Sequence, residues 1–311
     1  MVQSNKRRTF MDKPFLYSRQ KVILALLEAF GGTLPKTDMQ KYIFLFTQRC
    51  QKEGERSYDF IPYKYGCYSF QFEKDRQTLA DMGIIFGDDW RLPDGNEIYL
   101  KMFDKTEQSK MRYFAEIYKK KHGDALLHEV YTKYPYYAIN SEVKERVLNL
   151  EELEKVKVSV PHNDSVCFFT IGYEGKTIEN YINRLIKNNI HLVCDVRANP
   201  FSRKYGFSQR DLSVLLKKIG IEYVHMPELG IVSDKRQALK TQEDYDALFS
   251  WYEKNILPTK IEILNKLRDT LKQYKRIAIT CFEADVKQCH RGRIAKILSE
   301  QSDWNTPIEH I

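Results

Sequence analysis

The sequence lacks any long hydrophobic run. No segment approaches the roughly 18–20 consecutive apolar residues that a membrane-spanning helix needs. Residues 1–13 are polar and basic, without the apolar core of a secretory signal peptide. The six cysteines are scattered, and two of them lie inside apolar strand-like runs, which is typical of a reduced protein rather than a disulfide scaffold. We therefore expect a cytoplasmic protein without a membrane partner.

Paired cysteine motifs are also missing. There is no Cys-x2-Cys pair, and a Cys-x5-Arg phosphatase loop is absent because Lys287 and Ala295 stand six positions after Cys281 and Cys289. Cys281, Cys289 and His290 could supply three zinc ligands, but adjacent cysteine and histidine are an awkward arrangement for a single ion. The sequence therefore predicts no metal site and no cofactor.

No basic arm stands out either. The net charge is +8, and residues 1–160 carry 27 Lys and Arg against 23 Asp and Glu, which leaves 23 against 19 in the remainder. Each half therefore has an excess of about four positive charges. Such a balance permits a phosphate-bearing partner without identifying one, and it leaves the oligomeric state open.

The first half of the chain has the pattern of a mainly helical domain. We expect a polar leader over residues 1–14 and a winged-helix-like domain over 15–150. The apolar spacing predicts three helices, over residues 18–30, 37–46 and 70–82. A hairpin built from strands at 84–86 and 97–101 should follow, since 88–96 carries turn residues. Three helices followed by a hairpin are the outline of a winged helix-turn-helix.

Two short motifs in this half support that outline. Residues 60–70 read Phe-Ile-Pro-Tyr-Lys-Tyr-Gly-Cys-Tyr-Ser-Phe, and residues 130–135 are followed by Ser141. This pattern resembles a group of bacterial winged-helix-like proteins of the YwgA type over residues 18–148, with Cys67 in place of the usual proline. The resemblance implies a DNA- or partner-binding domain. The candidate recognition helix, 70–82, is not basic, so DNA and protein both remain open as its partner.

The pattern changes after a Glu/Lys-rich linker expected over residues 151–165. Unbroken apolar runs typical of buried strands alternate with helical segments, and the strands are expected at 166–171, 191–196, 221–225 and 276–282. Such runs indicate a parallel sheet covered by helices on both faces. Residues 166–311 are therefore predicted to form a Rossmann-like α/β domain.

Polar and reactive side chains follow every one of these predicted strands. Since ligands bind outside the carboxyl ends of the strands in open parallel sheets, these residues are the candidate site. The candidates are Tyr173, Glu174, Asp195, Arg197, Asn199, Arg203, His225, Glu228, Cys281, Glu283, Cys289, His290 and Arg291.

The same residues carry a resemblance to a known family. The ordered motifs are Thr170-Ile171-Gly172-Tyr173; Asp195-Val196-Arg197 with Pro200 and Ser202-Arg203; Tyr223, His225 and Pro227-Glu228-Leu229-Gly230; and Cys281, Glu283 and Cys289-His290-Arg291. They resemble the bacterial family known as domain of unknown function 488, over about residues 166–300. The resemblance implies a Rossmann-like three-layer domain and supplies no reaction.

The arginines of the predicted site favour a phosphate-bearing ligand, which includes DNA. Arg197, Arg203 and Arg291 offer fork-shaped donors that suit phosphate, and a helix beginning near Cys289 would add backbone N–H groups. The alternative is that one or two of these arginines pair with Asp195 or Glu283 and only brace the loops.

Three functions are compatible with the pattern. In the first, Asp195 and Glu283 stabilise a cationic sugar during N-glycosidic bond cleavage, with Tyr173 or Phe201 stacked on a base, which makes a hydrolase acting on nucleotide or nucleic acid. In the second, Cys289 has a lowered pKa beside His290 and acts in a thiol-centred enzyme or a redox-responsive DNA-binding regulator. The third is a non-catalytic binding module of a defence or toxin–antitoxin assembly.

Overall fold

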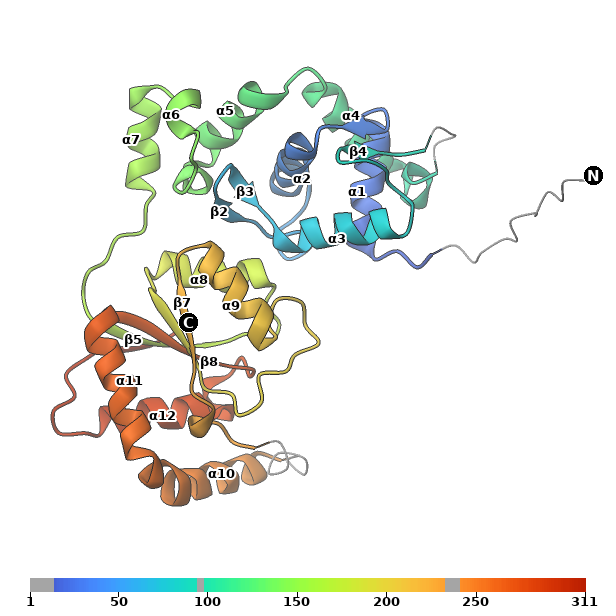
Figure 1. The fold of residues 1–311 in the computed structure, drawn as a ribbon. Coiled ribbons are helices and arrows are strands. Elements are labelled where there is room, and N and C mark those ends of the chain that lie inside the picture. The colour runs from blue at the N-terminus through green and yellow to red at the C-terminus, as the bar shows by residue number, and fades with distance from the viewer. Residues whose placement is uncertain (1–13, 94–97, 233–240) are drawn as a thin grey trace, which may run out of the picture. The chain divides into compact units, whose positions relative to one another are not determined.

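The computed structural model describes residues 14–93, 98–232 and 241–311. The chain forms two compact units, Met1–Lys157 and Val158–Ile311, which are treated separately (Figure 1). The division falls inside the segment expected to be a linker, whose first part belongs to helix α7 (Leu150–Val158). Within the described ranges no helix is both long and apolar enough to cross a membrane.

Helices dominate the first unit. The three helices expected from the apolar spacing are present as α1 (Ser18–Ala29), α2 (Lys36–Cys50) and α3 (Phe70–Asp81). They are followed by α4 (Lys105–Tyr118), α5 (Gly123–Lys133) and the short α6 (Lys144–Val147), and then by α7. Helices α1 and α2 are buried along most of their length and form the centre of the unit.

The strands of this unit are short and differ from the predicted hairpin. β1 (Thr33–Leu34) pairs with β4 (Trp90–Arg91), and β2 (Ile61–Tyr63) pairs with β3 (Gly66–Tyr68). The strand predicted at 84–86 is wrong, because these residues lie in a bend and an irregular segment shortly after α3. The strand predicted at 97–101 is wrong where it is described, because a 3-10 helix begins at Leu100; Glu97 lies outside the described residues. The Glu28 carboxylate accepts hydrogen bonds from the N–H groups of Ile98 (2.7 Å) and Leu100 (2.6 Å), which a strand partner would otherwise bind. A winged helix therefore remains a prediction.

The two motifs of the N-terminal resemblance pack against each other. Gly66 has a φ of 88° at the turn between β2 and β3, and a Cβ there would lie 2.5 Å from the ring of Tyr131. The hydroxyl group of Tyr131 is hydrogen-bonded to that of Ser141 at 2.8 Å. Glycine is therefore required at position 66 both by the backbone conformation and by the close ring.

The second unit is a Rossmann-like α/β domain, as predicted. Its parallel sheet has the order β7-β6-β8-β5-β9 and consists of β5 (Cys167–Gly172), β6 (Leu192–Asp195), β7 (Glu222–His225), β8 (Arg276–Cys281) and β9 (Ile308–His310). The first four correspond to the predicted strands. β9 was not expected, because a three-residue edge strand has no apolar run.

Helices cover both faces of this sheet (Figure 1). α8 (Ile178–Lys187) and α9 (Gln209–Lys218) lie on one face, and α11 (Ile261–Tyr274) and α12 (His290–Ser299) lie on the other. α10 (Gln242–Trp251) leads to α11 through a π-helix (Tyr252–Ile256) and a 3-10 helix (Leu257–Lys260). That irregular stretch contains Pro258, where the sequence predicts a break, since proline removes a helical hydrogen bond.

The order of the strands places a crevice at the centre of the sheet. The chain leaves β6 towards the β7 edge and leaves the neighbouring β8 towards the β9 edge. The two connections therefore diverge from the carboxyl ends of adjacent strands. Such a point is where open α/β sheets bind ligands.

Candidate functional site

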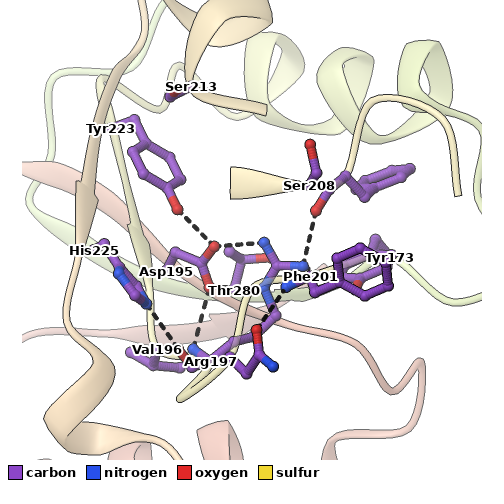
Figure 2. A network of polar contacts seen from close by, with 12 residues as sticks. Tyr173, Asp195, Val196, Arg197, Phe201, Ser208, Ser213, Tyr223, His225 and Thr280 are labelled. Atoms are coloured by element: carbon purple, nitrogen blue, oxygen red, sulfur yellow. Dashed lines mark hydrogen bonds and ion pairs between the residues drawn. The ribbon is translucent and has the colours of Figure 1, made fainter. Parts of the chain in front are cut away.

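A buried ion pair lies at the carboxyl end of β6 (Figure 2). Arg197 donates from Nε to Asp195 Oδ1 at 2.8 Å and from Nη2 to Asp195 Oδ2 at 2.5 Å. Its Nη1 donates to the hydroxyl oxygen of Tyr173 and to the carbonyl oxygen of Phe207, both at 2.9 Å. The hydroxyl group of Tyr223 donates to Asp195 Oδ2 at 2.7 Å. The pair thus ties β6, β7 and the loop after β5 together.

The burial and the hydrogen-bond partners of Asp195 and Arg197 determine whether the two side chains can bind a ligand. The Asp195 side chain is fully buried and Arg197 is 6% exposed. Burial by itself would lower the pKa of Arg197, but the hydrogen bond and the charge of Asp195 raise it overall, so the guanidinium stays charged. Both carboxylate oxygens of Asp195 already accept hydrogen bonds. This geometry is the bracing alternative for Arg197 and Asp195: Arg197 lines the pocket described below, but its guanidinium already binds Asp195, Tyr173 and Phe207.

Two glycines of the C-terminal sequence motifs allow the loops to approach one another. A Cβ on Gly172, the last residue of β5, would lie 1.8 Å from the carbonyl oxygen of Glu283. A Cβ on Gly230 would lie 2.1 Å from the backbone nitrogen of Ala198. Because both obstacles are backbone atoms, no rotation of a side chain could make room. The glycines therefore bring the loops after β5 and β8, and those after β6 and β7, into direct backbone contact.

A pocket of about 360 Å³ opens at these loops. Its polar lining includes Asn199 and Arg203, and Cys281 and His290 form part of its wall. Three aromatic side chains also line it, those of Tyr173, Phe201 and Phe282. Arg203 is exposed, and its guanidinium forms no hydrogen bond or ion pair with any residue that the structure describes. Arg203 is thus available to a ligand.

Three other residues that were predicted to contact a ligand, Arg291, Glu174 and His225, form hydrogen bonds with the protein backbone instead. Arg291 is 2% exposed and donates inward, to the carbonyl oxygens of Glu283 (2.5 Å) and Ala284 (2.9 Å), so it holds a loop instead of facing the pocket. Glu174 accepts a hydrogen bond from the backbone of Ala284 at 2.9 Å. His225 is hydrogen-bonded through Nε2 to the carbonyl oxygen of Arg197 at 2.8 Å. Each of these residues supports the loops around the pocket.

Glu228 is not brought to the same place. It is exposed and lines a separate hollow of about 260 Å³, together with Trp251 and Lys260. The 3-10 helix Pro227–Leu229 turns the chain away from the strand end directly after β7. Glu228 was predicted to belong to the site only because it follows a strand. That position alone does not determine where its side chain lies.

Two lysines that sequence reasoning missed add positive charge near the pocket. Lys176 donates from Nζ to the carbonyl oxygen of Gly172 at 2.8 Å, and Lys204 donates to that of Tyr173 at 3.1 Å. Burial lowers the pKa of both, and the pKa of Lys176 is lowered further by the positive charges of neighbouring side chains, including Lys204. Lys204 directly follows Arg203 in the motif, which was the signal available in the sequence.

A cluster of four potential metal ligands stands behind the pocket wall. The thiol of Cys281 lies 3.1 Å from Glu283 Oε2 and 3.4 Å from His290 Nδ1, and the thiol of Cys289 lies 4.0 Å from the same nitrogen. One ligand atom from each of the four residues lies within 4.8 Å of every other. Cys289 and His290 are neighbours in the sequence, which was the argument against a zinc site. In the structure their side chains nevertheless lie close to each other. The backbone changes from extended at Cys289 (φ −137°, ψ 138°) to helical at His290, so the two side chains do not point to opposite sides as in a strand.

The expected low pKa of Cys289 is wrong. Burial, and then the hydrogen bond with Cys281, raise the pKa of the Cys289 thiol well above its usual value of 9.0. The expectation rested on a helix N-terminus next to basic residues, but the Cys289 side chain is completely buried. Desolvation therefore outweighs the helix dipole, and removal from water favours the neutral thiol.

Comparison with known proteins finds a similarity in the second unit only. The family described as Domain of unknown function DUF488 matches residues 177–298, which agrees with the resemblance seen in the motifs. No curated protein and no solved structure matches the chain.

Proposed function

We propose that the second unit processes a nucleotide or nucleic acid and binds its phosphate group in the pocket beside Cys281 and His290. Arg203 carries this proposal, because it is an exposed guanidinium in the pocket with no partner among the described residues. Arg197 and Arg291, by contrast, already bind protein oxygens. A planar guanidinium binds phosphate through two parallel hydrogen bonds.

The aromatic lining supports a nucleobase as the other part of the ligand. Phe201 is 72% exposed and Phe282 is 44% exposed, so both rings are accessible to a ligand. Both line the pocket with Arg203. Aromatic side chains stack on bases without strong preference for one base, while a neighbouring cation holds the phosphate. The ligand class is therefore a nucleoside phosphate or a segment of single-stranded nucleic acid.

For the reaction we propose hydrolysis of the N-glycosidic bond. Cleavage passes through a cationic sugar that a carboxylate stabilises. Since Asp195 is paired with Arg197, Glu283 is the better candidate for this carboxylate: it is half-buried and touches Cys281, which lines the pocket. In this assignment Asp195 is a positioning residue.

The experiment is an assay for released base. The full chain is incubated with nucleoside 5′-monophosphates and with single-stranded and duplex DNA, and free base or abasic sites are measured. We expect Arg203→Gln to weaken binding about tenfold, the equivalent of one charge-assisted hydrogen bond. Arg210→Gln, on the exposed surface of α9, is the matched control and should bind as the wild type does.

Two outcomes would decide against the proposal. Equal affinity of wild type and Arg203→Gln for every phosphate compound would remove the pocket as the phosphate site. Unchanged turnover in Glu283→Gln would remove the assigned carboxylate. Binding that depends on Arg203, without any turnover, would instead favour a non-catalytic binding module.

A further inference from the structure

The buried cluster behind the pocket wall has the composition of a transition-metal site. Cys281 and His290 are each 1% exposed and Cys289 is completely buried, while Glu283 is half-buried. Two thiols, one imidazole and one carboxylate rarely meet in an interior without a reason, because each is a polar or reactive group removed from water. Their convergence calls for a chemical explanation beyond packing.

The dimensions of the cluster suit a tetrahedral ion. Zinc binds sulfur at about 2.3 Å and nitrogen or oxygen at about 2.0–2.2 Å, so tetrahedral ligand atoms lie roughly 3.3–3.8 Å apart. The contacts in the cluster are 3.1 Å, 3.4 Å and 4.0 Å. Small side-chain rotations would bring all four atoms to these separations, since none is more than 4.8 Å from another.

The imidazole of His290 is oriented as a ligand. Its Nε2 lies 2.9 Å from the carbonyl oxygen of Val196. A carbonyl oxygen only accepts, so in this contact Nε2 carries the proton, and in the neutral ring Nδ1 then holds the lone pair. Nδ1 is the atom that faces Cys281 and Cys289. A backbone carbonyl on the remote nitrogen is the arrangement that fixes metal-binding histidines in proteins.

The loop that carries the ligands is held in place by other residues. Arg291 binds the carbonyl oxygens of Glu283 and Ala284, and the absent side chain of Gly172 lets Glu283 approach β5. Asp285 accepts a hydrogen bond from the backbone of Lys287 at 2.8 Å, which closes the turn before Cys289. The ligand positions are thus set by the fold before any ion binds.

We propose that Cys281, Cys289, His290 and Glu283 bind one zinc ion. Two thiolates and one imidazole select a borderline-soft ion over magnesium or calcium, which prefer oxygen ligands. The ion ties the end of β8 to the start of α12. Binding releases the thiol protons, and the positive charge of the ion keeps both sulfurs as thiolates despite their burial.

The place of the site links it to the pocket. Cys281 and His290 line the pocket, so the ion stands directly behind its wall. Glu283, the one ligand that is not buried, is the one that water or a substrate oxygen replaces most easily. Three fixed ligands and one exchangeable position are the arrangement of catalytic zinc sites. In this use, the Glu283 carboxylate that leaves the ion is the one proposed to stabilise the cationic sugar. This catalytic use rests on the proposed function, whereas the metal site itself does not.

The test measures metal in the full chain. Protein purified under reducing conditions without chelators, and also reconstituted with zinc, is assayed by elemental mass spectrometry after gel filtration. We expect about one zinc per chain, in keeping with a single four-ligand site. Cys289→Ala should lose this zinc, whereas Cys194→Ala, a change of another completely buried cysteine of the same unit, in β6, should retain it.

A second measurement covers the case in which Cys289→Ala does not fold. In the wild-type chain, stepwise modification of thiols by a mercurial should release zinc as Cys281 and Cys289 react, and cobalt substitution should give thiolate-to-metal charge-transfer absorption. Reconstituted protein that retains no zinc or cobalt would overturn the proposal. So would zinc retained by the Cys281→Ala/Cys289→Ala double variant, or a Cys281–Cys289 disulfide present under the same reducing conditions.

The metal test and the phosphate-binding test fail separately. Glu283→Gln, by contrast, changes a proposed ligand, so its turnover is read together with its zinc content. Zinc content is measured without any nucleotide, and binding of nucleoside monophosphates is measured through Arg203→Gln, which changes none of the four ligands. A chain that holds zinc but binds no phosphate compound contradicts only the proposed function.

Discussion

A buried cation lines a pocket in each unit of this protein, Arg197 in the second and Lys41 in the first, and these two cations are in opposite situations. Arg197 of the second unit is 6% exposed and bonds to Asp195, Tyr173 and Phe207. Lys41 of the first unit is 5% exposed, and no described residue forms a hydrogen bond or ion pair with its ammonium group. It lines a pocket of about 270 Å³ between α2 and the β2–β3 hairpin.

The pKa values of these cations follow their partners. Burial lowers the pKa of Lys41, and the neighbouring Cys67 and Asp38 only partly oppose this. The pKa of Arg197 is raised instead, because the interactions with Asp195 exceed the effect of burial. Equal burial therefore gives opposite results: a paired charge braces the fold, and an unpaired one destabilises it at neutral pH.

The largest expected effect comes from breaking the pair. Asp195→Asn should destabilise the second unit by about 3–5 kcal/mol, because it leaves the Arg197 charge buried without compensation. Because the chain has two units, the loss is best measured by hydrogen exchange in peptides from β6 and β8. Tyr223→Phe removes one hydrogen bond to the same carboxylate and should cost only about 1 kcal/mol. Equal losses in the two variants would contradict the paired description.

The opposite sign is expected for Lys41. Lys41→Met keeps the volume of the side chain and removes the buried charge, so the first unit should gain about 1 kcal/mol at neutral pH. Lys120→Met, at an exposed position of the same unit, is the control and should change stability by less than about 0.5 kcal/mol. A loss of stability in Lys41→Met would mean that the ammonium has a stabilising partner.

The gain in Lys41→Met should also depend on pH. The folded-state pKa of Lys41 lies below the unfolded value of 10.5, so in the interval between them the unfolded chain binds more protons. Wild-type stability therefore rises with pH across that interval, while the penalty stays constant below the folded-state pKa. The difference in thermal midpoint between Lys41→Met and wild type should shrink as pH rises from neutral towards 10.5. A constant difference would contradict the lowered pKa.

The smallest effect on stability is expected at Arg203. Because its guanidinium has no partner among the described residues, Arg203→Gln should leave the free energy of unfolding within about 0.5 kcal/mol of wild type. The same change should weaken phosphate binding, as proposed above. A large loss of stability, measured by hydrogen exchange, would mean that Arg203 stabilises the fold as Arg197 does. It would then no longer be a candidate for ligand contact.

The parts of the fold that could be predicted are those whose sequence pattern has a single physical cause. Apolar runs such as 166–171 and 276–282 are long enough to mark buried parallel strands, so the sheet and its carboxyl edge were predictable. The edge strand β9 and the turn at Leu100 were not, because short segments depend on partners that are distant in sequence, such as Glu28.

The side chains of the site were less predictable than its position. Sequence placed Arg197, Arg203 and Arg291 at one edge but could not tell which of them point inward, since that depends on backbone carbonyls and on Asp195. Nor did spacing reveal that Cys281, Glu283, Cys289 and His290 converge. Their meeting depends on the turn between β8 and α12, which has no signature of its own.

The most direct test of the central claim is a diffraction experiment on crystals of the full chain grown with a nucleoside monophosphate. We predict phosphate density at the guanidinium of Arg203, in the pocket lined by Cys281 and His290. An empty pocket at saturating ligand, or a phosphate bound elsewhere on the second unit, would contradict the account.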